Sequence, residues 1–250
     1  MWVSYDGNAF VGWQSQSNGN AVQDALEAAF EALTGNRVVV HGSGRTDSGV
    51  HARGQVAHAD VPSKRLPVSS WAGALNSELP REVRVMKTTK APANFHARFS
   101  AIGKTYVYQI WNHRFQNPLE RKRTWHVATP LDRQMLRRIG LMLEGTHDFA
   151  AFAANRGTPE KSTLRTLHRV GLHCRGYLLR LTFEGEGFLY RMVRLLTGSM
   201  VRLAQGKKEF SWMEDLLLNP CGRKTSFCAP ADGLFLEKVH YRPVTAHSKS

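Results

Sequence analysis

The sequence predicts an α+β protein built from two halves, each a mostly antiparallel sheet flanked by helices. Helix-like and strand-like segments alternate in the order βαββαββ and then αββααβ, which favours sheets with helices packed against them. Apolar residues make up 42% of the 250 residues, so the chain is long enough to bury a sizeable core. We place the boundary near residues 97–103, which gives halves of residues 1–98 and 99–242 and a polar tail of residues 243–250.

Five segments have the periodicity or the end signals of helices. Between Asn20 and Gly35, apolar residues recur every three or four positions, and Asn20 is the expected cap. Ser211 and Glu214 have the spacing of a capping box at the start of the last helix. The predicted helices cover residues 20–34, 70–78, 132–144, 188–204 and 211–219.

The strand-like segments are rich in β-branched and aromatic residues. In residues 103–111, Tyr106, Tyr108 and Ile110 alternate onto one face. The segments at 37–40 and 55–61 flank a glycine-rich stretch, which we therefore expect to form a loop held by two strands. After a short first strand at the N-terminus, the predicted strands cover residues 37–40, 55–61, 82–89, 103–111, 169–174, 177–185 and 233–241.

The chain is strongly basic, with 34 Lys+Arg against 20 Asp+Glu and a formal net charge of +14. Such a surplus predicts a polyanionic partner, with nucleic acid first and an anionic membrane surface second. No run approaches the ~18 apolar residues that a membrane span needs, and the first residues lack a signal-peptide pattern. The 3 cysteines form no CxxC pair, which favours free thiols in a reducing cytoplasm.

The most informative stretch is GSGRTDSGVHARGQ, residues 42–55, which places Asp47 near Arg45 among glycines. In one interpretation Asp47 caps a turn, as aspartate often does. In another it is a reactive carboxylate on a loop whose glycines let a bulky ligand approach the backbone. A metal site is a third interpretation, although the spacing matches no metal-binding motif. Its ligands would come from His41, Asp47, His51, His58 and Asp60.

The segment FHARFSAIGKTYVY, residues 95–108, combines cations with an aromatic residue inside a predicted strand. Tyr106 fits either a half-buried sheet position or a stacking platform for an RNA base, and Tyr108 is the less favoured platform. Between residues 98 and 138 the chain carries nine Lys and Arg against Glu120 and Asp132. This bias favours contacts with phosphates, because a solvated charged face usually mixes signs.

A third informative stretch is FLYRMVRLLTGSM, residues 188–200. Arg191 and Arg194 are three residues apart and can share a helix face, which would ordinarily mean two solvated arginines. Arg194, however, follows Val193 of the apolar stripe, which favours its partial burial. A buried arginine needs a partner, and a loop carboxylate such as Asp47 would serve.

Taken together, these stretches resemble the TruA family of tRNA pseudouridine synthases. The similar blocks are YDGNAFVGWQ, GRTDSGVHA, NFHARFSA followed by KTYVY, FLYRMVR followed by GS, and GLFLEKVHY, in the family's order from Tyr5 to Tyr241. The resemblance implies the pseudouridine synthase fold, with two ferredoxin- or RRM-like halves and an active-site cleft between them. It also implies a homodimeric isomerase that holds tRNA in basic clefts and modifies uridines of the anticodon arm, just 3′ of the anticodon. The family needs no metal and no organic cofactor.

The resemblance also assigns roles to five residues. Asp47 falls on the catalytic aspartate, and Arg45 on the arginine that contacts the flipped nucleotide or fills its vacancy. Tyr106 falls on the aromatic residue that stacks on the target base. Arg194 falls on the helix arginine that pairs with the aspartate, and Leu234 on an apolar residue that lines the uracil pocket.

Pseudouridine formation breaks the bond between ribose C1′ and uracil N1 and joins C1′ to C5, which requires a flipped base and a reactive carboxylate. Asp47 could add to C1′, add to uracil C6, or remove the C2′ proton to give a glycal, which is the route we favour. Two other functions stay open. One is a non-catalytic RNA-binding protein or tRNA chaperone, for which Asp47 is dispensable. The other is a metal-dependent nuclease that uses the loop histidines.

Overall fold

The computed structural model describes residues 1–17, 19–61, 66–155, 157, 162–220 and 222–242. The predicted polar tail of residues 243–250 lies outside the described residues. The protein has the predicted mixed α+β fold, in which a large, mostly antiparallel sheet is flanked by helices. None of the helices in the described residues combines the length and the apolar character that crossing a bilayer demands.

The strands form one sheet that is continuous through both predicted halves. They are β1 (Trp2–Tyr5), β2 (His41–Gly42), β3 (His51–His58), β4 (Val83–Lys87), β5 (Ala101–Asn112), β6 (Trp125–Val127), β7 (Gly145–Asp148), β8 (Leu164–Arg175), β9 (Leu178–Gly185) and β10 (Leu234–Tyr241). Their order is β4-β1-β3-β10-β5-β9-β8-β7, with β2 paired to β3 and β6 to β5.

The position of β10 determines how the two sets of strands meet. It lies between β3, to which it is parallel, and β5, to which it is antiparallel. Its first three residues, Leu234, Phe235 and Leu236, are all buried, as expected for a central strand covered on both faces. A strand from the end of the chain therefore joins the N-terminal strands to β5, and the domain boundary at residues 98 and 99 stays a prediction.

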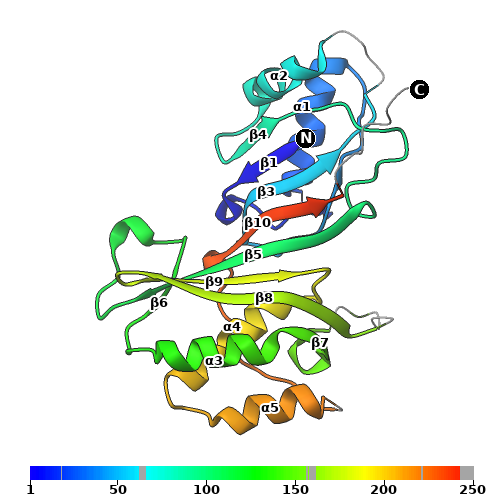
Figure 1. Ribbon diagram of the computed structural model, residues 1–250. Coiled ribbons are helices and arrows are strands. Elements are labelled where there is room, and N and C mark those ends of the chain that lie inside the picture. Colours follow the sequence, from blue (N-terminus) through cyan, green and yellow to red (C-terminus); the bar gives the residue numbers. More distant parts are fainter. Residues whose placement is uncertain (18, 62–65, 156, 158–161, 221, 243–250) are drawn as a thin grey trace, which may run out of the picture.

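The helices lie in two groups at opposite ends of the sheet (Figure 1). The α-helices are α1 (Val22–Thr34), α2 (Trp71–Glu78), α3 (Arg133–Leu143), α4 (Met192–Ala204) and α5 (Phe210–Leu218). Helices α1 and α2 accompany the strands β4, β1 and β3, whereas α3, α4 and α5 accompany β8 and β9. Short 3-10 helices cover Gly7–Ala9, Val68–Ser70, Pro118–Glu120, Ala150–Phe152 and Ala231–Gly233. A single cluster of buried apolar residues includes members from both groups.

Several predicted element ends are wrong, for identifiable reasons. Asn20 does not cap α1, because its φ of 63° is left-handed. The cap is Ala21, whose backbone N–H donates to Asp24 Oδ2 at 2.9 Å. Helix α4 begins at Met192 rather than at residue 188, because Arg191 has a φ of 59°. The cap of α5 is Glu209, so the predicted capping box of Ser211 and Glu214 does not form there.

Residues 37–40 alternate as a strand would, but they do not pair with one. Val38 and Val40 are buried and Val39 is exposed, which matches the predicted alternation. The polar backbone of Val40 is satisfied by α1 instead: its N–H donates to Glu27 Oε1 at 3.0 Å, and its carbonyl accepts from Gln23 Nε2 at 3.2 Å. The strand that leads into the glycine-rich loop is therefore β2, at His41–Gly42.

Candidate active site

Asp47 lies on the loop between β2 and β3, as predicted. The loop turns immediately after it, with a hydrogen bond from Val50 N to Asp47 O at 3.1 Å. Gly49, the third residue of this turn, has a φ of 79°, a conformation that favours glycine. On the other side, Asp47 forms an isolated antiparallel bridge with Gly12. Asp47 does stand in a turn, and its backbone rather than its carboxylate forms the turn's hydrogen bond.

Buried polar side chains hold the part of the loop that precedes Asp47. Gln55 of β3 accepts from Ser43 Oγ at 2.6 Å and donates from Nε2 to Gly44 O at 2.9 Å. The hydroxyls of Tyr5 and Thr46 are 2.9 Å apart. Burial raises the pKa of Tyr5 to about 12, so this hydroxyl keeps its proton at neutral pH. These contacts fix the backbone immediately before Asp47.

A close approach by Trp13 explains one of the loop glycines. A Cβ at Gly42 would lie 2.4 Å from Trp13 Cε2, closer than any real contact. Trp13 N donates to Thr46 O at 3.2 Å, so the tryptophan is also fixed through its backbone. Gly42 thus lets the indole pack against the loop, while Gly49 permits the turn.

The carboxylate of Asp47 forms an ion pair with Arg194 of α4. Arg194 Nη1 donates to Asp47 Oδ2 at 3.0 Å, and the two side chains are only 14% and 19% exposed. Arg194 Nε also donates to Ala229 O at 2.8 Å. An arginine held at two edges of its planar fork has a fixed orientation, which a lysine could not reproduce. The pairing expected from the sequence is therefore present.

The segment before β10 packs tightly on α4 and fixes this arginine. Ala229 N donates to the carbonyl of Arg194 at 3.0 Å, so the two residues are joined in both directions. A Cβ at Gly198 would lie 1.9 Å from the carbonyl oxygen of Phe227, which leaves room for glycine alone. Ser199 and Thr225 also share a hydrogen bond between their hydroxyls at 2.9 Å. Helix α4 is otherwise nearly all buried, so Arg194 depends on Asp47 and Ala229 for its partners.

Arg191 supplies a second cation near Asp47, a contact that the sequence analysis did not predict for it. Its Nε lies 4.0 Å from Asp47 Oδ2, and its side chain is 43% exposed. The guanidinium also lies 5.0 Å from the ring centroid of Tyr190. Both cations meet Oδ2, so among the described residues Oδ1 of Asp47 takes part in no hydrogen bond or ion pair.

A cavity of about 510 Å³ lies beside the loop. This volume is within the usual range of small-molecule sites. Arg45 and Tyr106 are among its lining residues, whereas Asp47, Arg194 and Leu234 are not among the described residues that line it. The lining is Trp13, Gln14, Gln23, Val40, His41, Gly42, Ser43, Gly44, Arg45, His96, Arg98, Phe99, Lys104, Tyr106 and Phe188.

The two tyrosines of β5 have different environments. Tyr106 is 8% exposed and meets Phe188 edge to face, with ring centroids 4.9 Å apart. Tyr108 is fully buried, and its hydroxyl donates to Pro230 O at 2.7 Å. Burial raises its pKa well above the ordinary value for tyrosine. Tyr106, which lines the cavity, is thus the better placed of the two to meet a ligand.

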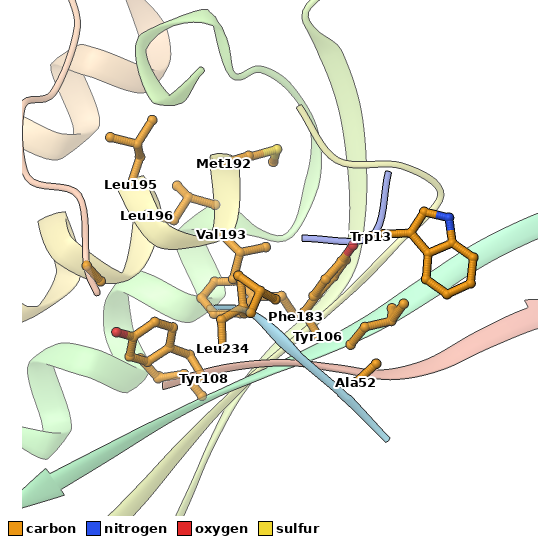
Figure 2. Packing of buried hydrophobic residues seen from close by; sticks show 14 of the residues in the cluster. Trp13, Ala52, Tyr106, Tyr108, Phe183, Met192, Val193, Leu195, Leu196 and Leu234 are labelled. Carbon is orange, nitrogen blue, oxygen red and sulfur yellow. The ribbon is translucent and has the colours of Figure 1, made fainter. Parts of the chain in front are cut away.

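Leu234 is the first residue of β10 and pairs with Tyr108 of β5. It is buried in the apolar layer shown in Figure 2, near Tyr108, Phe183 and Val193. Tyr106 lies on the side of this layer toward Trp13. Leu234 is therefore a buried member of this apolar layer, and its role at the uracil stays a prediction.

His51, of the same sequence motif, connects three loops. Its Nδ1 accepts from Gly7 N at 3.2 Å, and its Nε2 lies 2.9 Å from Lys122 O and 3.1 Å from Asp232 O. These partners assign the proton to Nε2 of a neutral ring. Burial lowers the pKa of His51, and the nearby Asp6 carboxylate opposes that shift.

The histidines considered as metal ligands are not arranged as a metal site. Within the described residues, no group of three or more His, Cys, Asp and Glu side chains is placed to hold a metal ion. The rings of His41 and His58 stack on one another instead of converging on a point. The two cysteines in the described part of the chain, Cys174 and Cys228, are free.

A loop carboxylate held by arginine beside a cation-lined cavity suits an enzyme that acts on an anionic substrate. The chain belongs to the tRNA pseudouridine synthase family, whose sequence pattern matches residues 1–100 and 141–242. It is 45% identical to a tRNA pseudouridine synthase A of Akkermansia muciniphila, over 99% of this chain and 96% of the relative.

Two other relatives are similar over nearly their whole length. The tRNA pseudouridine synthase A 1 of Protochlamydia amoebophila is 39% identical over 96% of this chain and 95% of the relative. The tRNA pseudouridine synthase A of Acetivibrio thermocellus is 37% identical over 96% of this chain and 97% of the relative. The family expected from the sequence is thereby confirmed, together with its enzyme class, since pseudouridine synthases are isomerases.

Proposed function

We propose that this protein isomerises uridine to pseudouridine in tRNA, with Asp47 as the reacting carboxylate. The observation that carries the proposal is the ion pair between Asp47 and Arg194 beside a cationic, aromatic cavity in a chain of this family. The reaction breaks C1′–N1, turns the uracil and forms C1′–C5. N1 gains a proton and the C5 hydrogen leaves as a proton, so the atoms balance without a redox step, a metal or an organic cofactor.

Asp47 is suited to this chemistry by its two unequal oxygens. Oδ2 is engaged by Arg194 at 3.0 Å and approached by Arg191 at 4.0 Å, so the negative charge of the carboxylate has cationic partners in the site. Oδ1 takes no part in these two contacts, so it is the oxygen that we expect to react with the nucleoside. Because the loop backbone is fixed around Asp47, the carboxylate is held in place before the substrate arrives.

The cavity offers a flipped base an aromatic ring on which to stack and a cation beside it. Flipping costs a few kcal/mol of lost stacking and pairing, and one aromatic stack returns about 1–3 kcal/mol. Tyr106, braced edge to face by Phe188, is the proposed stacking ring. We assign Arg45 either to contact the flipped nucleotide or to fill the space that the nucleotide vacates. Leu234 is assigned to pack against the uracil.

Three finer parts of the proposal rest on family membership and composition. The target is the anticodon arm, at uridines just 3′ of the anticodon, and the working form is a homodimer. Light scattering on the purified protein tests the dimer. A cytoplasmic location fits the free Cys174 and Cys228. The charge of +14 suits a tRNA partner, and binding should weaken as salt rises.

One assay separates the proposed function from its alternatives. The protein is incubated, in EDTA, with tRNA carrying tritium at uracil C5. Tritium released into water from intact tRNA supports the proposed isomerisation. Bound but unchanged tRNA would contradict it in favour of an RNA chaperone, and tRNA cleaved only when metal is restored would contradict it in favour of a nuclease.

A further inference from the structure

Three histidine rings pack together beside the cavity. His41 of β2 faces His58 of β3 across the strand pair, with ring centroids 5.0 Å apart in a stacked arrangement. His96, which precedes β5, lies 4.6 Å from His58 and 5.7 Å from His41. The catalytic proposal uses none of these rings, and two of them, His41 and His96, line the cavity.

Backbone N–H groups donate hydrogen bonds to two of the three rings. His58 Nδ1 accepts from Ala97 N at 3.1 Å, and His96 Nδ1 accepts from Arg98 N at 3.1 Å. Each of these nitrogens uses its lone pair, so protonating it would break a hydrogen bond. Burial lowers the pKa of His58, followed by the charges of His96 and His41. Among the described residues, the side chain of His41 has no hydrogen bond and is the ring that can take up a proton without losing one.

The cavity beside His41 is lined by cations and by no carboxylate among the described residues. Arg45, Arg98 and Lys104 face it, and the ring of Phe99, 76% exposed, stands at its edge. Burial lowers the pKa of Lys104, followed by the like charge of Arg98. An anion in the cavity would relieve this repulsion.

Three other charged groups, Asp60, the N-terminal ammonium and Glu27, are not among the described residues that line the cavity. The Asp60 carboxylate raises the pKa of His58 and the N-terminal ammonium lowers it, both less than burial does. Glu27 is occupied by the backbone of Val40, the residue before His41. The charged side chains that line the cavity with His41 are therefore the cations Arg45, Arg98 and Lys104.

We propose that this cavity binds a phosphodiester of the RNA substrate and that His41 takes up one proton from solvent when the phosphodiester binds. The inference rests on the proposed function, because it assumes an RNA substrate. The same cavity carries Tyr106, so the phosphodiester belongs to the target nucleotide or to its neighbour. His58 and His96 form the platform of rings that holds His41, and Phe99 offers a face on which a base can stack.

Proton uptake on binding makes RNA affinity depend on pH in a defined direction. A phosphate next to an imidazole favours its charged form, so affinity rises as pH falls through the range in which histidine titrates. One fully coupled proton changes the dissociation constant by about tenfold per pH unit, which is the upper limit for this site.

The test measures binding rather than turnover. The dissociation constant of an RNA hairpin is determined by fluorescence anisotropy between about pH 5.5 and 8, at constant ionic strength. The variants are His41→Phe, which keeps the stacked ring, and His173→Gln, which removes an exposed histidine on β8 away from the cavity. We expect the wild type and His173→Gln to tighten by about 3- to 10-fold as pH falls. His41→Phe should lose most of that change, and a pH slope equal to that of the wild type would overturn the proposal.

A second measurement needs no variant. The ring protons of His41 are followed by NMR as pH changes, with and without the RNA hairpin. The midpoint of the His41 titration should move upward when RNA is bound, and an unmoved midpoint would overturn the inference. The experiments distinguish failure of the His41 inference from failure of the proposed isomerase function. Tritium release with a pH slope unchanged by His41→Phe would overturn this inference alone, and a His41-dependent slope without tritium release would overturn the isomerase alone.

Discussion

Arg194 Nη1 donates to Asp47 Oδ2 at 3.0 Å, which joins two residues that are 147 positions apart in the chain. The pair links the β2–β3 loop to α4, and each member is also fixed by its own surroundings. Arg194 is tied to the backbone of Ala229, and Asp47 stands in a loop held by Gln55. The geometry of the carboxylate is therefore set by the fold, before any substrate binds.

Replacing Arg194 should remove activity almost completely. Arg194→Ala leaves Asp47 without its principal cation, and we expect kcat/KM for tritium release to fall by about 100-fold or more. Arg194→Lys should retain part of the activity, because one ammonium cannot reach both Asp47 and the carbonyl of Ala229 in the fixed geometry of the guanidinium. Equal activity in the alanine and lysine variants would contradict a role for the charge. Thermal unfolding of each variant controls for misfolding.

Replacing Arg191 should matter much less. Its side chain is 43% exposed and lies 4.0 Å from Asp47, and exposed pairs of this kind contribute about 0–1 kcal/mol. Arg191→Asn tolerates the left-handed backbone at φ 59°, so it removes the cation without adding strain. We expect tritium release within about fivefold of the wild type. A loss as large as that of Arg194→Ala would show that Arg191 is as essential as Arg194 and would contradict its minor role.

Two variants of Tyr106 separate the role of its aromatic ring from the role of its hydroxyl. Tyr106→Phe keeps the ring against Phe188, and we expect most of the activity to remain. Tyr106→Ala removes a stack worth about 1–3 kcal/mol, so kcat/KM should fall by about 10- to 100-fold. Tyr108→Phe serves as a matched control on the same strand, outside the described lining of the cavity. Loss of activity in Tyr106→Phe as severe as in Tyr106→Ala would refute stacking as the main role.

His51 should make the folded state sensitive to acid. Burial lowers its pKa in the folded protein, so the unfolded chain binds the proton more readily. The contribution to stability is complete above the unfolded pKa of about 6.5 and is lost as pH falls from there toward the lowered folded value. Denaturant unfolding between about pH 8 and 5 should show this decline in the wild type and in His173→Gln. His51→Gln, although less stable throughout, should show a shallower decline, and an unchanged slope would exclude His51 as its source.

Local patterns were enough to predict most helices and the central pair of the site. The stripe in α4 marked a buried face, and an arginine next to that face required a distant acid, which pointed to Asp47. The alternation in β5 correctly placed Tyr106, Tyr108 and Ile110 on one buried face. These features depend on neighbours within a few residues, or on a charge that must be paired.

Features set by distant contacts could not be read in the same way. The apolar run at Leu234 predicted a strand, but not that the strand would lie between β3 and β5. Residues 37–40 alternated correctly, yet side chains of α1 satisfy their backbone instead of another strand. The packing of His41, His58 and His96 depends on register between β2 and β3 and on the path of the chain before β5.

The central claim is tested most directly by Asp47→Asn in the tritium-release assay on intact tRNA. Asparagine keeps the shape of the side chain and removes the reacting oxygen anion. The account predicts no detectable tritium release, with tRNA binding retained within a few-fold and a folded protein by circular dichroism. Turnover by Asp47→Asn near the wild-type rate would contradict the assignment of Asp47 as the reacting group.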